Sequence, residues 1–288
     1  MRPTMAQLGR ISSLTVVRDT PQGLYLDGGA LGELLLPARL VPLGLAIGEA
    51  VEVFVYRDSE DRLVATTERP RACVGEFACM RVKDLHPRAG AFLDWGLSKD
   101  LLLPFKEQRP KVEVGQDVVV AVVLDEDTDR IIATTYLDRH FSRDVPPYAA
   151  GAEVDLLIFG RGDLGYNAIV DGRFRGLLYH AGLTVPLRRG SRHRGFVTLV
   201  REDGKIDLSL DASGYERIGP LAEQVLAELE RVGGRLNFDD SSSPEEIRRR
   251  FGASKKAFKQ ALGALYRERR IRFLEPGIQL IDREGDRA

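Results

Sequence analysis

The residues that precede Arg194 combine aromatic rings with arginines in a way that suits a nucleic acid. Residues 172–194 include six arginines and two histidines but no acidic residue. Single-stranded nucleic acids are bound by aromatic rings that stack on bases and by cations that follow the phosphates. Any one ring here would more often belong to a core, but the cluster favours contact. The candidate contacts are Tyr166, Arg173, Phe174, Arg175, Tyr179, His180, Arg188, Arg189, Arg192 and Arg194.

A second basic segment lies near the C-terminus. Residues 248–272 include ten lysines or arginines against the single acid Glu268, although the net charge of the whole chain is −1. Clustered charge of this kind is typical of a surface that faces a polyanion, and a solvated charged face is the alternative. Phosphate contact is favoured over base reading, because Gln260 is the only amide on the polar face. The candidate contacts are Lys255, Lys256, Lys259, Arg267, Arg269 and Arg270.

An internal repeat organises residues 1–210. Gly23-Leu-Tyr-Leu-Asp27 reappears as Gly90-Ala-Phe-Leu-Asp94, and Leu34-Leu-Leu-Pro37 reappears as Leu101-Leu-Leu-Pro104. A more diverged third copy has Leu177-Leu-Tyr-His180 at the Leu-Leu-Leu-Pro position. In each copy, β-branched or aromatic runs alternate with turns rich in glycine or aspartate. Five short strands per copy predict a mainly β fold of tandem OB barrels, at residues 1–69, 70–145 and 146–213.

The hydrophobic period changes to that of helices after Pro220. Leu221, Val225, Leu229 and Val232 fall at helical spacing. Ser243-Pro-Glu-Glu246 then predicts a capped helix start, Gly252 predicts the end of that helix, and Ser254 predicts the cap of the next. Two short strands flank Glu275-Pro-Gly277. Helices followed by a hairpin predict a small α+β winged-helix domain at residues 214–288.

The second barrel offers a smaller set of candidate contacts, and for these the sequence leaves RNA contact and internal packing equally open. They are Phe92, Trp95 and Lys106.

Signals that would indicate an enzyme fail on their context. Gly160-Arg-Gly-Asp-Leu-Gly165 matches the dinucleotide fingerprint, but a strand follows where a helix is required, so a tight β-turn is predicted. The four histidines show no metal-ligand spacing. No nucleophile elbow or phosphate-binding loop is present. The sequence therefore predicts no catalysis, no metal, no cofactor and no small-molecule substrate.

The location is predicted from the apolar runs and the cysteines. No stretch approaches the roughly 18 uninterrupted apolar residues of a membrane span. Only Cys73 and Cys79 are present, which is too few for a disulfide framework. A cytoplasmic protein without a membrane partner is predicted.

Three motifs resemble the conserved virulence factor B family of bacteria. They are Gly90-Ala-Phe-Leu-Asp-Trp-Gly96, Asp203-Gly-Lys-Ile-Asp-Leu-Ser209, and Ser254-Lys-Lys-Ala-Phe-Lys259 followed by Leu265-Tyr266. The resemblance covers nearly the whole chain. It implies three barrels of the type found in the largest protein of the small ribosomal subunit (S-one-type domains) and a C-terminal winged helix. The first barrel departs most from the ribosomal pattern, with few aromatics and a net negative charge.

The resemblance also implies single-stranded RNA binding and a regulatory role in gene expression. Together with the charge pattern, it predicts a non-catalytic post-transcriptional regulator in which the third barrel and the winged helix form one basic surface. Two alternatives stay open. One is a transcription regulator that binds DNA through the winged helix, and the other is an adaptor that binds ribosomal or RNA-processing proteins.

Overall fold

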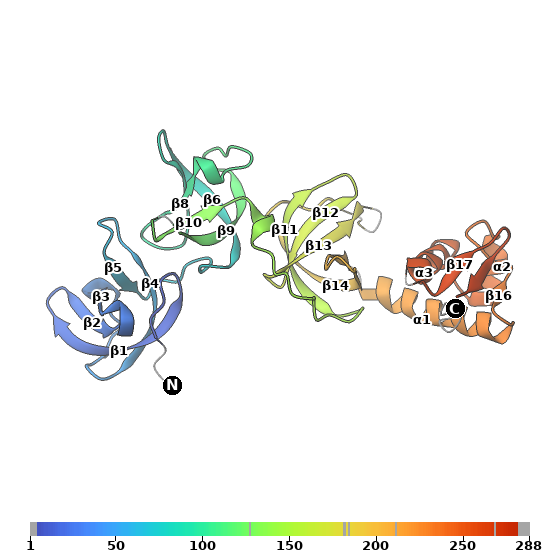
Figure 1. Cartoon of the computed structure of the whole chain (residues 1–288), viewed down its shortest axis with the longest axis horizontal. Helices are drawn as coiled ribbons and strands as arrows, with labels where there is room; N and C mark the ends of the chain where they lie inside the picture. The colour runs from blue at the N-terminus through green and yellow to red at the C-terminus, as the bar shows by residue number, and fades with distance from the viewer. Residues whose placement is uncertain are drawn as a thin grey trace, which may run out of the picture. The chain divides into compact units, whose positions relative to one another are not determined.

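The computed structural model of the chain describes residues 5–126, 128–180, 183, 185–210, 212–267 and 269–281, without the side chains of 212–220, 256 and 267. Within them lie three successive five-stranded β units and a C-terminal helical unit, coloured from blue to red in Figure 1. The predicted mainly β fold with a terminal winged helix is confirmed. Contacts divide the chain into two compact units, one of residues 1–146, 155–193 and 203–205 and the other of residues 147–154, 194–202 and 206–288.

Each β unit consists of five strands. The first contains β1 (Ile11–Thr20), β2 (Gly23–Asp27), β3 (Glu33–Pro37), β4 (Ala50–Arg57) and β5 (Leu63–Thr66). The second contains β6 (Phe77–His86), β7 (Gly90–Leu93), β8 (Leu101–Pro104), β9 (Asp117–Asp125) and β10 (Arg130–Thr134). The third contains β11 (Glu153–Arg161), β12 (Gly165–Val170), β13 (Phe174–Tyr179), β14 (Arg192–Val200) and β15 (Ile206–Ser209).

The strand order is the same in all three units. The first is a closed barrel in the order β1-β2-β3-β5-β4, and the third is a closed barrel in the equivalent order β11-β12-β13-β15-β14. The second is a five-stranded sheet in the order β10-β9-β6-β7-β8, which is the same cyclic order without the closing ladder. This is the order of an OB barrel, as the repeat predicts. The predicted domain limits at 69 and 145 fall between strands of successive units, and the limit at 213 falls at the start of α1 (Ala212–Arg231).

A glycine at the start of the second strand fixes the register of every unit. Gly23, Gly90 and Gly165 pair with Pro37, Pro104 and Tyr179 on the neighbouring strand. A side-chain carbon at any of these glycines would collide with a backbone carbonyl oxygen of that strand. Close backbone approach therefore requires glycine at this position.

This register corrects the predicted alignment of the third copy by one residue. Tyr179, and not His180, occupies the position of Pro37 and Pro104, so residues 176–179 replace the Leu-Leu-Leu-Pro segment. Side chains alternate between the two faces of a strand, so a shift of one residue exchanges core and surface positions. Tyr166 is accordingly equivalent to Leu24 and Ala91, and Asn167 is equivalent to Tyr25 and Phe92.

A β-bulge interrupts the first strand of every unit at the same place. It lies between Val16 and Arg18, between Val82 and Asp84, and between Ile158 and Gly160. A bulge adds one unpaired residue and re-aims its side chain. The added residues are Val17, Lys83 and Phe159.

The three β units are joined by apolar contacts. Phe54 of β4 belongs to the same buried cluster as the core of the second unit, where its ring lies 5.3 Å from that of Trp95, edge to face. A separate cluster joins the second and third units, and its buried members include Phe77 on β6, Leu157 on β11 and Ile169 on β12. Each of the three barrels thus contributes part of its outer surface to a contact with a neighbour.

The C-terminal domain contains three helices and a small sheet. Its helices are α1, α2 (Pro244–Phe251) and α3 (Lys255–Arg267), and its strands are β16 (Arg235–Leu236), β17 (Ile271–Phe273) and β18 (Ile278–Leu280). The sheet has the order β16-β18-β17. Leu229, Ile247, Phe258 and Ile278 are fully buried in one core.

Local capping chemistry follows the prediction in α2 and α3. The Ser243 side chain accepts a hydrogen bond from the backbone N–H of Glu246, and Gly252 closes α2 in the left-handed conformation. The Ser254 hydroxyl accepts from the N–H of Ala257. The first helix begins before the apolar spacing that follows Pro220, because α1 starts eight residues earlier, at Ala212. No helix among the described residues is long and apolar enough to cross a membrane.

Candidate nucleic-acid interface

The outer face of each barrel carries one cross-strand pair at the same register. The pairs are Tyr25 with Leu35, Phe92 with Leu102, and Asn167 with Leu177. These side chains are half-buried, whereas their neighbours along the strands lie in the cores. A ring at the first position of a pair is suited to base stacking. The third barrel lacks such a ring, because Asn167 stands there.

In the first barrel this ring is covered by a cation. The guanidinium carbon of Arg18 lies 3.9 Å from the centre of the Tyr25 ring. The same guanidinium forms an ion pair of 2.6 Å with Glu33. One face of Tyr25 is therefore occupied, and the arginine that covers it is already paired with an acid.

In the second barrel the three candidates have different environments. Phe92 is half-buried on the outer face, with His86 edge to face at 6.5 Å. Trp95 is only 2% exposed, and its indole N–H donates to the Ala72 carbonyl oxygen at 2.8 Å. Of the two interpretations left open for Trp95, the structure supports packing. Lys106 is exposed, and its ammonium lies 3.5 Å from the Asp125 carboxylate.

In the third barrel two predicted stacking rings point into the core. Tyr166 is 5% exposed and Phe174 is 3% exposed, so neither offers a free face in this structure. Tyr166 lies on the core side of β12, because it is equivalent to Leu24 and Ala91 in the first two barrels. Tyr179 is half-buried at the end of β13, and His180 packs edge to face against Tyr166 at 5.2 Å. The His180 Nε2 lies 3.0 Å from the Gly162 carbonyl oxygen, within the tight turn predicted at Gly160.

Three of the six predicted arginines are engaged in ion pairs. Arg175 lies 2.7 Å from Asp138, and Arg173 lies 2.9 Å from Asp144. Both acids follow the last strand of the second barrel, so these pairs tie the third barrel to that segment. Arg194 lies 3.5 Å from Glu153. The other three predicted arginines, Arg188, Arg189 and Arg192, have different surroundings.

Arg188, Arg189 and Arg192 are exposed and have no ion pair with any residue that the structure describes. Their loop lies against β6 of the second barrel, because a side chain at Gly190 would collide with the Cys79 sulfur. Burial raises the pKa of the Cys79 thiol and the three arginines oppose that shift, which also places their charges near β6. These three residues form the free arginine group.

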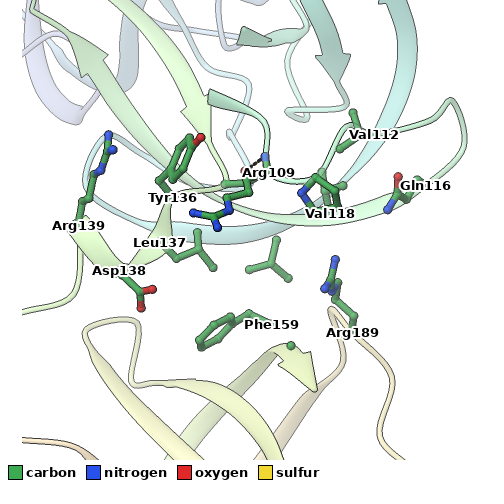
Figure 2. Close-up of a pocket in the computed structure, with 14 residues that line it drawn as sticks. Arg109, Val112, Gln116, Val118, Tyr136, Leu137, Asp138, Arg139, Phe159 and Arg189 are labelled. Carbon is green, nitrogen blue, oxygen red and sulfur yellow. Dashed lines mark hydrogen bonds between the residues drawn. The ribbon is translucent and has the colours of Figure 1, made fainter. Parts of the chain in front are cut away.

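A cleft opens next to the free arginine group, between the second and third barrels (Figure 2). Its volume is about 650 Å³. Arg109, Tyr136 and Arg139 border it from the second barrel, while Phe159 and Arg189 border it from the third. We call it the inter-barrel cleft.

The sequence interpretation missed both rings of the inter-barrel cleft. Phe159 was hidden because it is the added residue of a bulge, so simple strand alternation does not predict its outward direction. Tyr136 follows β10 in a segment that carries no repeat motif. One signal could have identified Phe159. When the three copies are aligned on Gly23, Gly90 and Gly165, Phe159 falls at the same bulge position as Val17 and Lys83.

The predicted lysines of the winged helix contact the loop before α2. The Lys255 ammonium donates to the Ser241 carbonyl oxygen at 3.2 Å, and Lys259 lies 3.1 Å from the Asp240 carboxylate. Arg269 is exposed and Arg270 is half-buried next to β17. The predicted side chains of Lys256 and Arg267 lie outside the described residues. No group of three or more potential metal ligands occurs in the part of the chain that the structure describes.

Comparison with protein families identifies both ends of the chain. Residues 8–68 match the S1 domain, and residues 223–280 match the CvfB-like winged helix domain. The first match covers the first barrel, the copy that departs most from the ribosomal pattern. The second match covers most of α1 and the rest of the winged helix.

Several known proteins are similar over most of the chain. An uncharacterized protein, YitL, of Bacillus subtilis is 28% identical over 94% of this chain and 91% of its own. A conserved virulence factor B of Staphylococcus saprophyticus is 28% identical over 79% of this chain and 78% of its own. A crystal structure of a multidomain protein with nucleic acid binding domains from Streptococcus pneumoniae covers 95% of this chain and 98% of its own, at 23% identity and a TM-score of 0.41. The matching families and relatives confirm the resemblance to the conserved virulence factor B family.

Proposed function

We propose that this relative of the conserved virulence factor B proteins binds single-stranded RNA and regulates gene expression after transcription, without catalysis. Its partners are then RNA strands in the cytoplasm, where two free thiols such as Cys73 and Cys79 are stable. The S1 and winged-helix matches at the two ends support a nucleic-acid ligand. The preference for RNA over DNA rests on the OB barrels, which suit unpaired strands with exposed bases.

The observation that carries the proposal is the free arginine group. Several other arginines of the barrels already have a carboxylate partner, as Arg18, Arg173 and Arg175 do. An arginine that is exposed and without an acid can neutralise a phosphate without first losing an ion pair. Three such residues within five positions, at the end of a loop and the start of β14, provide a site for consecutive phosphates.

The winged helix contributes less to this argument. Two of the lysines on its α3 already contact the loop of residues 239–241. A helix whose cations are held by its own domain has to give up these contacts before it enters a DNA groove. The contacts of Lys255 and Lys259, the two α3 lysines whose side chains are described, therefore do not favour duplex DNA.

The salt dependence of RNA binding tests the proposal. Binding of a fluorescent oligouridylate to the full chain is measured by anisotropy at several salt concentrations. If about six phosphates are engaged, log K falls with log[salt] with a slope of about −4, at about 0.7 per phosphate for a single strand. Changing Arg188 and Arg192 together to glutamine is expected to reduce the steepness by about 1.4.

A matched control carries the same loss of charge elsewhere. Arg10 and Arg39 are exposed residues in or beside the first barrel, and changing both to glutamine is expected to leave the slope unchanged. A flat salt response of the natural chain refutes the proposal. Equal affinity for duplex DNA, with a defined footprint, points to a transcription regulator instead. Association with ribosomes that survives nuclease treatment points to a protein-binding adaptor.

A further inference from the structure

The inter-barrel cleft lies between two barrels that are packed firmly together. Phe77, Leu157 and Ile169 are buried where the barrels meet. The ion pair of Arg175 with Asp138 crosses the same boundary. The Ser142 N–H also donates to the Arg173 carbonyl oxygen at 2.8 Å. Because these contacts hold the barrels in place, the cleft is formed before any ligand arrives.

The charge of the cleft is positive and largely uncompensated. Three arginines border it, Arg109 and Arg139 from the second barrel and Arg189 from the third. The acid among the lining residues is Asp138, and Arg175 already pairs with its carboxylate. The three guanidinium groups have no ion pair with a described residue, so an anion of the size of phosphate is the ligand that they favour.

Two aromatic rings give the cleft flat surfaces next to these charges. The Arg139 guanidinium carbon lies 4.6 Å from the centre of the Tyr136 ring, so the cation covers one face of that ring. The Phe159 ring is supported by Phe141, at 5.7 Å between ring centres. Aromatic rings and guanidinium planes are the surfaces on which unpaired bases stack. An inorganic anion or an acidic peptide would leave these surfaces unused.

A hydrogen-bonding edge is present as well. The Gln116 side chain lines the cleft, and its oxygen accepts from the backbone N–H of Glu113 at 3.0 Å. That bond orients the amide and leaves its two N–H groups as donors. The volume of about 650 Å³ lies within the range of about 300–1,000 Å³ that is usual for small-ligand sites.

We infer that the inter-barrel cleft binds one nucleoside phosphate unit, with its phosphate at the arginines and its base against Tyr136 or Phe159. The inference rests on the proposed function, because we assign the unit to an RNA strand that passes through the cleft. A free nucleotide has the same chemistry, and the experiment separates these two sources.

The test uses the full chain with an oligouridylate and, separately, with uridine monophosphate. Changing Arg109 and Arg139 to glutamine removes two charges of the cleft and leaves the free arginine group unchanged. This variant is expected to reduce the steepness of the salt slope for the oligonucleotide by about 1.4. Tyr136→Leu is expected to weaken binding by about 5-fold or more, whereas Tyr136→Phe keeps the ring and the affinity. An oligouridylate that carries 4-thiouridine is expected to crosslink to peptides that contain Tyr136 or Phe159.

The outcomes distinguish the two proposals. If the natural chain binds the oligonucleotide and the Arg109/Arg139 variant behaves like the Arg10/Arg39 control, the cleft is not a subsite although the proposed function stands. If uridine monophosphate alone binds, and the Arg109/Arg139 variant loses it, the cleft is a nucleotide site and RNA binding is refuted. If neither ligand binds, both proposals fail.

Discussion

The change of Trp95 to phenylalanine separates a packing role from an RNA contact. Trp95 is the only tryptophan of the chain and lies in the cluster that joins the first two barrels. Its indole N–H donates to the Ala72 carbonyl oxygen, and its ring meets Phe54 edge to face. Phenylalanine keeps an aromatic ring but loses the donor and the second ring. The matched variant is Phe92→Leu on the outer face of the same barrel.

The size of the effect follows from the two losses. An unsatisfied buried carbonyl costs about 1–3 kcal/mol. The smaller ring leaves a cavity that costs a further 1–2 kcal/mol or so, less than the roughly 3–5 kcal/mol for truncation of a buried ring to alanine. The free energy of unfolding is therefore expected to fall by about 2–5 kcal/mol. At about 2–4 °C per kcal/mol for a body of this size, the melting temperature drops by about 4–20 °C.

Thermal unfolding is followed by far-UV circular dichroism, and oligouridylate affinity is measured well below the transition. Trp95→Phe is expected to have a lower melting temperature and to bind RNA with the affinity of the natural chain. Phe92→Leu is expected to melt nearly normally but to lose about 1–3 kcal/mol of binding free energy, the value of one stacked base. If Trp95→Phe lowers the affinity as much as Phe92→Leu without a change in melting, the packing argument is refuted.

Three further variants test other parts of the structure. Gly90→Ala is expected to destabilise the second barrel more than Gly115→Ala in thermal melts, because both glycines have positive φ but only Gly90 abuts the neighbouring strand. Hydrogen bonds from Arg231 and Arg250 lower the pKa of Glu228 to about 2, below its ordinary value of 4.5. A depressed folded-state pKa stabilises the fold above pH 4.5 and loses that effect as pH falls towards 2, so a Glu228→Gln variant should show a weaker decline of stability in acid titrations. Ser243→Ala removes the cap of α2 and is expected to cost the winged helix about 1 kcal/mol in urea denaturation, and an unchanged midpoint would argue against the cap.

The features that the sequence predicts well are those that depend on neighbouring residues. Ser243 and Gly252 mark the ends of α2 because capping requires a side-chain oxygen or a left-handed residue within one turn. The glycine repeat at Gly23 and Gly90 predicts successive barrels for the same reason, since a close backbone approach admits no other residue. Such signals lie within a short stretch of the chain.

The candidate site was harder to predict because it depends on register and on contacts between barrels. The predicted alignment of the third copy was shifted by one residue at His180, and only the register shows that Tyr166 lies in the core. The ion pairs of Arg173 and Arg175 join residues that are 29 and 37 positions apart, and charge counting along the sequence does not reveal them. The outward direction of the Phe159 side chain follows from the bulge in β11, which strand alternation does not predict.

The buried cluster at Leu157 and Ile169 also limits how this chain can be divided. A fragment that begins with the third barrel uncovers these apolar side chains, which the second barrel otherwise shields from water. Exposed apolar patches of this kind drive self-association. The outer face of the third barrel has become specific to its neighbour, so the copies are no longer interchangeable modules. Deletion studies should therefore keep residues 70–213 as one piece, and a transplanted third barrel needs polar replacements at both positions.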